Sequence, residues 1–287
     1  MDATILGQTM ISGILTGGLY ALLAIGLTMI FGVLKIINFA HGEFLMLGMY
    51  LSFFLTTGLK LDPYLSVLFA IPVFFLIGIA VQKGLIDRVV MSSHDIQILL
   101  TLGLSLFLQN LALFIWGPHL KSMQSQYLLK VFRIGTLNIN STRLIAFVFA
   151  LAMTGVLYLF LKRSDIGKAI RACSEERRGA QVVGINIQKM YLLAFGIGSA
   201  CAGVAGTLLM PFYYADPHVG MAFVLVAFVV VVLGGMGNFL GALLGGFIIG
   251  LAEAFGAIIL PAALKQVVTF VIFVLILFFK PTGLFGK

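Results

Sequence analysis

Charged side chains are scarce in this sequence. Lys, Arg, Asp and Glu make up 10% of the 287 residues, 61% of the residues are hydrophobic, and the mean hydropathy is +1.14. A soluble domain carries about 25% charged residues, because its surface must be hydrated. The shortage of charge therefore excludes a soluble fold. The net charge of +8 lies in connecting segments rather than in a continuous stripe, so we expect no nucleic-acid partner.

Cysteine and the common catalytic motifs are also missing or nearly so. Cys173 lies in a polar segment and Cys201 in an apolar one, which indicates neither a disulfide framework nor a metal site. The sequence has no Gly-x-x-x-x-Gly-Lys-Ser/Thr phosphate loop, no His-Glu-x-x-His and no Gly-x-Ser-x-Gly elbow. No nucleophile–base pair is evident, so we expect no enzyme activity. If the protein moves substrate uphill on ATP, another chain must bind the nucleotide.

Apolar stretches fill most of the chain. A hydrocarbon core about 30 Å thick needs roughly 20 apolar residues per helix. The sequence therefore predicts an all-α polytopic membrane protein of about eight to ten transmembrane helices, forming one domain over residues 1–287. No basic segment follows Met1, so we expect the first stretch to remain as a span. The apolar stretches are 5–33, 39–59, 64–82, 96–116, 144–161, 190–210, 221–233, 241–260 and 264–280.

A basic segment, 162–189, interrupts the apolar stretches. Positive loops are retained on the cytoplasmic side of a membrane, so this segment predicts the orientation of the chain. It places the C-terminus in the cytoplasm and the N-terminus in the periplasm. The connector 117–143 would then lie outside, and it also carries positive charge. The excess of positive charge on the cytoplasmic side is therefore a bias rather than a complete separation. The basic residues of segment 162–189 are Lys162, Arg163, Lys168, Arg171, Arg177, Arg178 and Lys189.

Glycines four residues apart mark places where membrane helices approach closely. Gly241 and Gly245 form one such pair, and Gly246 and Gly250 form another. The spacing fits packing within the chain and also fits a dimer interface.

Two polar interruptions occur where polar groups are costly. The first is 38–43, with Asn38, His41, Gly42 and Glu43. The second is 234–239, with Gly235, Gly237 and Asn238. Their comparable places in the two halves predict discontinuous helices in pseudo-symmetric halves, lining a substrate route. The alternative is two tight interfacial turns whose polar side chains reach lipid headgroups.

Two other polar features leave alternatives open. Glu253 is an acid inside an apolar stretch, and it fits a helix–helix hydrogen bond or an ion-coupling site. His41 beside Glu43 lacks further residues at ligand spacing, so we expect no metal.

Four segments together resemble the LivH-type permease subunit of branched-chain amino-acid ABC importers. They span nearly the full length in the family's order, and the Asn-Phe-Ala-His-Gly string at 38–42 is the most specific. The segments are Gly18–Leu22 followed by Ile37–Glu43, Arg171-Ala172 followed by Gly184-Ile185, Leu233–Asn238 followed by Gly241-Ala242, and Phe279–Gly286.

The resemblance implies a permease of a bacterial inner membrane with several partners. These are a second related permease, two cytoplasmic ATPases that hold ATP and magnesium, a periplasmic substrate-binding protein, and membrane lipid. This chain itself is expected to bind no cofactor. In the family, a short cytoplasmic helix seats in a groove of the ATPase, and it corresponds here to Arg171 through Gly184. Its match to the Glu-Ala-Ala-x-x-x-Gly pattern is incomplete. The expected coupling residues are Arg171, Glu175, Glu176, Ala180, Gly184 and Ile185.

The expected function is ATP-driven import of Leu, Ile and Val. Importers of urea or short-chain amides use closely similar permeases, so they remain the main alternative. A secondary carrier that works alone on a proton or sodium gradient is a further alternative, with Glu43 or Glu253 as its acid.

Overall fold

The computed structural model describes residues 3–123, 130–261 and 264–286, and within these it is a helical bundle with one short β-hairpin. Each of the nine expected apolar stretches forms a helix, which confirms the all-α polytopic class. Seven of these helices are long and apolar enough to cross a membrane, and α9 and α11 are shorter. The elements are α1 (Ala3–Leu34), α2 (His41–Leu59), α3 (Ser66–Gly84), a 3-10 turn (Ile86–Arg88), α4 (His94–Trp116), β1 (Val131–Ile134), β2 (Leu137–Asn140), α5 (Ser141–Arg163), α6 (Asp165–Glu175), α7 (Arg177–Val182), α8 (Ile187–Leu209), α9 (Val219–Gly234), α10 (Phe239–Ile259) and α11 (Lys265–Phe279).

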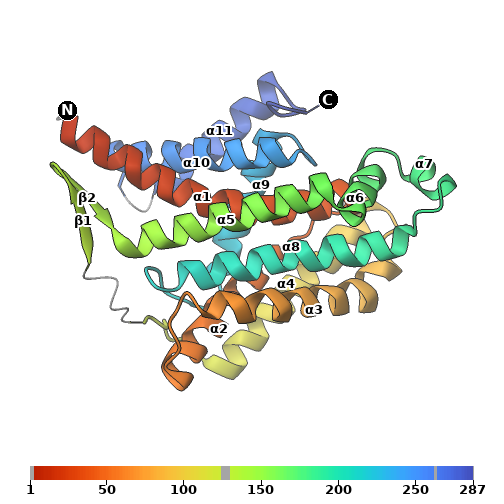
Figure 1. Cartoon of the computed structure of the whole chain (residues 1–287), viewed down its shortest axis with the longest axis horizontal. Coiled ribbons are helices and arrows are strands. Elements are labelled where there is room, and N and C mark those ends of the chain that lie inside the picture. The colour runs from red at the N-terminus through yellow and green to blue at the C-terminus, as the bar shows by residue number, and fades with distance from the viewer. Residues whose placement is uncertain (1–2, 124–129, 262–263, 287) are drawn as a thin grey trace.

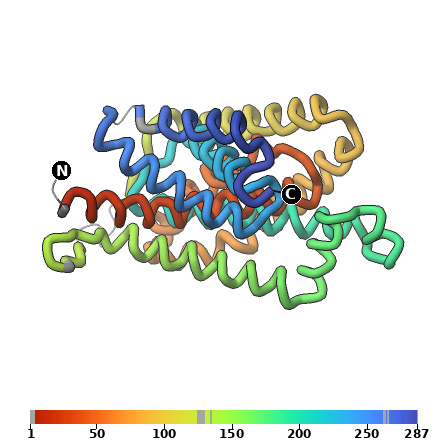
Figure 2. Tube along the Cα trace, turned by 90° about the horizontal axis from the view of Figure 1, so that it is seen from above, coloured from red at the N-terminus to blue at the C-terminus, as the bar shows by residue number. Residues whose placement is uncertain are grey.

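The long helices run side by side between two ends of the molecule (Figure 1). One end holds the N-terminus and the antiparallel β1–β2 hairpin. The other end holds α6, α7 and the C-terminus, and is called the basic end below. A view from above shows the same elongated bundle, with α6 and α7 projecting beyond it (Figure 2).

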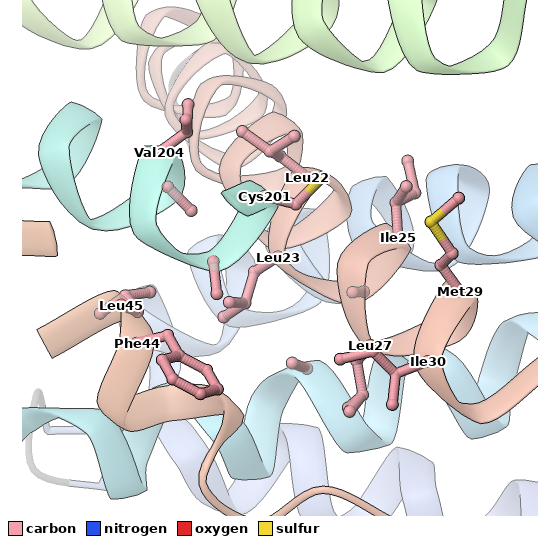
Figure 3. Packing of buried hydrophobic residues seen from close by; sticks show 14 of the residues in the cluster. Leu22, Leu23, Ile25, Leu27, Met29, Ile30, Phe44, Leu45, Cys201 and Val204 are labelled. Atoms are coloured by element: carbon pink, nitrogen blue, oxygen red, sulfur yellow. The ribbon is translucent and has the colours of Figure 1, made fainter. Parts of the chain in front are cut away.

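The core is formed around α1, α8 and α9. α1 and α8 are both 83% buried over their most apolar windows, whereas α3, α4 and α5 are 28% buried. Figure 3 shows the α1 side chain Leu23 between α8, with Cys201 and Val204, and the start of α2, with Phe44. The outer helices expose large apolar side chains, as expected for contact with lipid.

The glycine pairs pack within the chain. A Cβ atom at Gly17 would lie 2.9 Å from the carbonyl oxygen of Gly246, and one at Gly250 would lie 2.5 Å from that of Gly13. These contacts bring α1 and α10 close together. Lipid tails are as apolar as the helix surfaces, so dispersion attraction between closely packed atoms, rather than the hydrophobic effect, holds such helices together. The glycine spacing fitted either packing within the chain or a dimer interface, and the structure shows packing within the chain.

Two helices, α2 and α9, begin inside the bundle rather than at an end. His41, the first residue of α2, contacts the carbonyl of Leu23, about 16 Å before the end of α1 at 1.5 Å per residue. The connector 35–40 therefore runs back into the protein. α9 begins at the same place, after connector 210–218. The order long helix, connector, inner helix thus occurs twice in opposite directions, as in inverted-repeat transporters.

Basic residues are unequally divided between the two ends. The far end, opposite the basic end, has Lys60, Lys121, Lys130, Arg133, Arg143 and Lys265 on its connectors and helix starts. The basic end has Lys35, Lys83, Arg88, Lys162, Arg163, Lys168, Arg171, Arg177, Arg178, Lys189 and Lys280.

Candidate functional site

The N-termini of α2 and α9 meet in the interior through two glycines. Gly42 and Gly220 leave no room for a side chain, because a Cβ at Gly220 would lie 2.6 Å from the carbonyl oxygen of Gly42. Both residues are buried. The positive ends of two helix dipoles therefore point to one place. Such a meeting of helix N-termini favours a negatively charged group.

Glu43 supplies a negative group at that place. It lies in the first turn of α2 and is fully buried. Its Oε1 accepts hydrogen bonds from Ser105 at 3.0 Å and from Gln109 at 2.8 Å, and its Oε2 has no partner among the described residues. Neutral donors thus surround a carboxylate that forms no ion pair in the described part of the chain. This arrangement can accept a cationic group from a ligand.

His41 and Asn38 shape the entry to α2. The His41 Nε2 lies 3.1 Å from the Leu23 carbonyl, and because a carbonyl only accepts, Nε2 carries the proton. The Asn38 Oδ1 accepts from the Ala40 backbone N–H at 3.1 Å. Both side chains are buried, and the His41 Nδ1 and Asn38 Nδ2 have no partner among the described residues. The 38–43 interruption is therefore an interior break rather than a surface turn.

A polar face of α4 completes this region, and it was not among the sequence expectations. Gln97, Thr101, Ser105 and Gln109 follow each other at four-residue spacing and are all buried, while the opposite face exposes residues such as Phe114. Thr101 donates to the Ile37 carbonyl at 3.0 Å. A polar period of four inside an apolar span was the signal that would have revealed it.

A histidine from the second connector also joins the cluster. The His218 Nδ1 lies 3.4 Å from the Gln109 Oε1, and His218 directly precedes α9. We call Glu43, Ser105, Gln109 and His218 the central polar cluster. Helices α2 and α4 and the start of α9 each contribute to it.

The second interruption, 234–238, has different surroundings. It is a turn between α9 and α10 in which Gly235 and Gly237 have φ of 94° and 88°, a left-handed region that favours glycine. The Asn238 Oδ1 caps α10 through the Gly241 N–H at 2.9 Å, and its Nδ2 donates to the Phe285 carbonyl at 3.0 Å. The structure thus brings Asn38, His41, Gly42 and Glu43 together, and places Gly235, Gly237 and Asn238 in a turn at the basic end.

A cavity of about 610 Å³ opens beside that turn. Gly237 and Asn238 line it together with Lys35, Arg171 and Glu175. Two expected pathway residues therefore share a cavity with two expected coupling residues. This proximity of the two sets was not expected from the sequence.

The expected coupling segment forms two short helices rather than one. Ser164 caps α6 through the Gly167 N–H at 2.9 Å, and Glu176 separates the helices and caps α7 through the Arg178 N–H at 3.1 Å. At the end of α7, the Val182 and Val183 side chains are 86% and 75% exposed. This apolar tip projects from the basic end.

Gly184 ends α7 in a Schellman motif. Its φ is 86°, its N–H bonds the Gln181 carbonyl at 3.1 Å, and the Ile185 N–H bonds the Ala180 carbonyl at 3.0 Å. Ala180 is buried, and Ile185 packs against the same core, as is usual for this motif. Ala180, Gly184 and Ile185 therefore shape the end of the segment.

Cys173 lies beneath this segment. Its side chain is buried on the inner face of α6, and burial raises the pKa of the thiol, an effect that nearby Arg177 partly offsets. Arg177 also lies over the Tyr191 ring at 5.3 Å from its centroid. The thiol is therefore a poor nucleophile at neutral pH. Among the described residues, no group of three His, Cys, Asp or Glu side chains is placed to hold a metal ion.

Comparison with known proteins identifies the family. The family model of the permease component of branched-chain amino acid transport systems matches residues 9–277. The permease BraD of the high-affinity branched-chain amino acid transport system of Pseudomonas aeruginosa is 36% identical, over 98% of this chain and 95% of its own length. The LivH permeases of Escherichia coli K12 and Salmonella typhimurium are 34% identical over the same shares.

More distant matches extend the comparison. The probable permease LivM of Methanocaldococcus jannaschii is 25% identical over 93% of this chain and 90% of its own length. No solved structure matches the chain. The full-length matches and the polytopic helical fold together show that this chain belongs to the family of branched-chain amino acid transport permeases, and that it is a transporter component rather than an enzyme.

Proposed function

We propose that this chain is the membrane-spanning permease subunit of an ATP-driven ABC importer that moves Leu, Ile and Val across a bacterial inner membrane. The observation that carries the proposal is the near full-length similarity to several branched-chain amino acid permeases. The interior supports it, because a chain this apolar buries a group of polar side chains at the junction of α2, α4 and α9.

The central polar cluster is the proposed passage for the substrate. The substrate's ammonium group would bind Glu43, whose Oε2 has no partner among the described residues. The N-termini of α2 and α9 favour its carboxylate. Apolar neighbours such as Phe44 suit an aliphatic side chain. Because one methylene is worth only about 1–3 kcal/mol, the separate binding protein would set most of the selectivity.

Coupling to ATP hydrolysis is assigned to α6 and α7. The apolar tip at Val182 and Val183 would seat in a groove of a cytoplasmic ATPase. Closure of two ATPases would push on α6, and α6 would then move toward the α9–α10 turn, because Arg171 and Glu175 line the same cavity as Gly237 and Asn238. The ATPases would hold ATP and magnesium, so the permease itself needs no cofactor.

The remaining partners follow from the same proposal. The similarity to both LivH and LivM permeases supports a pair of two related permeases in one importer. A periplasmic binding protein would dock at the far end, where Lys121 and Ala215 pair across two connectors. The excess of basic residues at α6 and α7 supports a cytoplasmic position for that end.

Uptake by the complete importer tests the proposal. In a deletion strain that expresses all subunits, labelled leucine should accumulate and unlabelled Ile and Val should compete, whereas urea and acetamide should not. Glu43→Gln should lower leucine uptake at least about tenfold, the scale of a lost charge-assisted hydrogen bond. Asp95→Asn, an acid-to-amide change at an exposed position of α4, is the matched control and should leave uptake unchanged. Competition by urea or amides instead of Ile and Val would assign the importer to that alternative class.

A secondary carrier is the rival from another class, because Glu43 and Glu253 are buried acids. This chain reconstituted alone in liposomes distinguishes the two. Leucine flux under a proton or sodium gradient without ATPases would support the carrier and contradict the importer.

A further inference from the structure

The second buried acid, Glu253, lies in a different place, at the wall of a separate cavity. This cavity, called the outer cavity below, has a volume of about 390 Å³ and lies between the first half of α1, the second half of α10 and the start of α5. Those helix segments belong to the end that holds the N-terminus and the hairpin (Figure 1). Small-molecule sites in proteins span roughly 300–1,000 Å³. The outer cavity is therefore large enough for an amino acid.

One wall of the outer cavity is a polar face of α1. Gln8, Ser12, Thr16 and Tyr20 follow each other at four-residue spacing, and all four line the cavity. Tyr20 is buried, whereas the other three are half-buried. Gln8 exchanges two hydrogen bonds with the backbone of Asn138, at 2.6 and 3.0 Å, and so holds the hairpin beside the cavity. A helix facing only lipid or apolar neighbours would not carry such a face.

Glu253 lies at the buried end of that face. Its side chain is 5% exposed, its Oε2 accepts from the Tyr20 hydroxyl at 2.8 Å, and its Oε1 accepts from Thr269 at 2.8 Å. A carboxylate has about four acceptor positions, so each oxygen can accept one more hydrogen bond. In the described part of the chain the acid forms no ion pair. A ligand's ammonium group would supply the missing positive charge.

Arg143 supplies the opposite charge in the same cavity. It lines the outer cavity from the first turn of α5, and its guanidinium lies 5.7 Å from the centroid of the Phe212 ring. Arg143 is exposed, so a ligand entering from the end of the molecule would meet it first. A guanidinium binds a carboxylate through two parallel hydrogen bonds.

The part of the cavity wall that α10 forms beyond Glu253 is apolar. Ala254, Ala257 and Ile258 share one face of α10 with Glu253 and suit an aliphatic side chain. At the buried end of the cavity, the Tyr20 ring packs edge-on against Phe223, with ring centroids 6.3 Å apart. The outer cavity shares no lining residue with the central polar cluster.

We infer that the outer cavity is a binding site for a zwitterionic α-amino acid with an aliphatic side chain, in which Glu253 holds the ammonium group and Arg143 holds the carboxylate. The site rests on the proposed function and adds to it a first binding position in the permease itself. An acid, a guanidinium, hydroxyl groups and an apolar wall in one cavity match each part of such a substrate.

Direct binding to the complete importer, purified without the binding protein, tests the site. Three probes differ by one group each: leucine, 4-methylpentanoate, which lacks the ammonium group, and leucinamide, which lacks the carboxylate. The wild-type importer should bind leucine at least about tenfold more tightly than either analogue. Glu253→Gln should remove the preference over 4-methylpentanoate, and Arg143→Gln should remove the preference over leucinamide.

Thr269→Val is the matched control, because it removes a hydrogen bond from Glu253 but keeps the charge. It should preserve the order of the three probes. If both charge variants bind the three probes in the wild-type order, Glu253 serves only as a helix–helix hydrogen bond and the inference is overturned. If Glu253→Gln does not assemble, Arg143→Gln alone decides, since its exposed side chain makes it tolerant to change.

Uptake by the same wild-type importer separates this result from the proposed function. Leucine uptake with unchanged probe preferences in both variants would overturn the outer site alone. If the importer accumulates urea or amides and not leucine, the proposed function and the outer site both fail.

Discussion

At the scale of single residues, the packing of the interior helices depends on glycines, which have no side chain. Gly42 and Gly220 let two helix starts touch, and this contact covers Glu43 on one side. The polar groups beside it are few, with Ser105 and Gln109 on α4 and His218 just before α9. Their positions are therefore sensitive to small displacements of the backbone.

Gly42→Ala should destabilise the permease by about 1–3 kcal/mol, the usual cost of overpacking a close contact. The new methyl group would push α2 away from the Gly220 backbone. Thermal unfolding of the detergent-solubilised importer and leucine uptake measure the effect. Gly58→Ala in the same helix is the control. No atom lies within 4 Å of its added Cβ, so it should be neutral or stabilising by up to about 1 kcal/mol. Equal melting temperatures for both variants would contradict the contact.

At the scale of elements, the apolar stretches predicted nine helices, seven of them long enough to span a membrane, because bilayer thickness fixes the length of an apolar span. It did not predict the interior start of α2. A polar turn such as 38–43 can have the same local amino-acid sequence whether it lies at the membrane surface or inside the protein. For that reason the sequence could also not separate 38–43 from the 234–238 turn. What distinguishes them is tertiary contact, with Leu23 in one case and Phe285 in the other.

The same limit applies to the coupling segment. Its charge predicted an exposed connector, but the break at Glu176 between α6 and α7 depends on a cap that the sequence pattern did not reveal. The period-four polar face of α4 was readable from the sequence. The assignment of these residues to pathway and coupling stays a prediction.

Gly184→Val should uncouple ATP hydrolysis from uptake while leaving the permease in the membrane. A β-branched residue in the left-handed region costs about 1–2 kcal/mol, so the end of α7 should lose its Schellman motif. The ratio of ATP hydrolysed to leucine imported in proteoliposomes should rise severalfold. Gly179→Ala is the control in the same helix. Its added Cβ would meet only the flexible Glu176 side chain, and the ratio should stay at the wild-type value. An unchanged ratio in Gly184→Val would remove the coupling role of this turn.

At the scale of the whole molecule, the distribution of basic residues and the arrangement of the helices both distinguish two ends. The helices α6 and α7 and the C-terminus share one end, while the N-terminus and the hairpin share the other (Figure 1). The long helices join them, with α1 and α8 as the buried centre. A single measurement of sidedness therefore orients every element.

Val182→Cys should react with a membrane-impermeant maleimide only in inside-out vesicles, and Leu120→Cys only in right-side-out vesicles. Both positions are exposed, at 86% and 63%, and lie at opposite ends. Native Cys173 should not interfere at neutral pH, because burial raises the pKa of its thiol and leaves little thiolate. Labelling of Val182→Cys from the periplasmic side would reverse the orientation and remove the proposed ATPase contact.

The contact between Gly42 and Gly220 also has a consequence for biogenesis. Chains fold as they are synthesised from the N-terminus, so α2 enters the bilayer long before the ribosome has made α9. Ser105 and Gln109 arrive with α4 and can solvate Glu43 early, but the cover from Gly220 comes only after most of the chain has been translated. A nascent chain stalled before α9 would hold a carboxylate within the bilayer without this cover, which is energetically costly, so unfinished chains should be less stable in the membrane than finished ones.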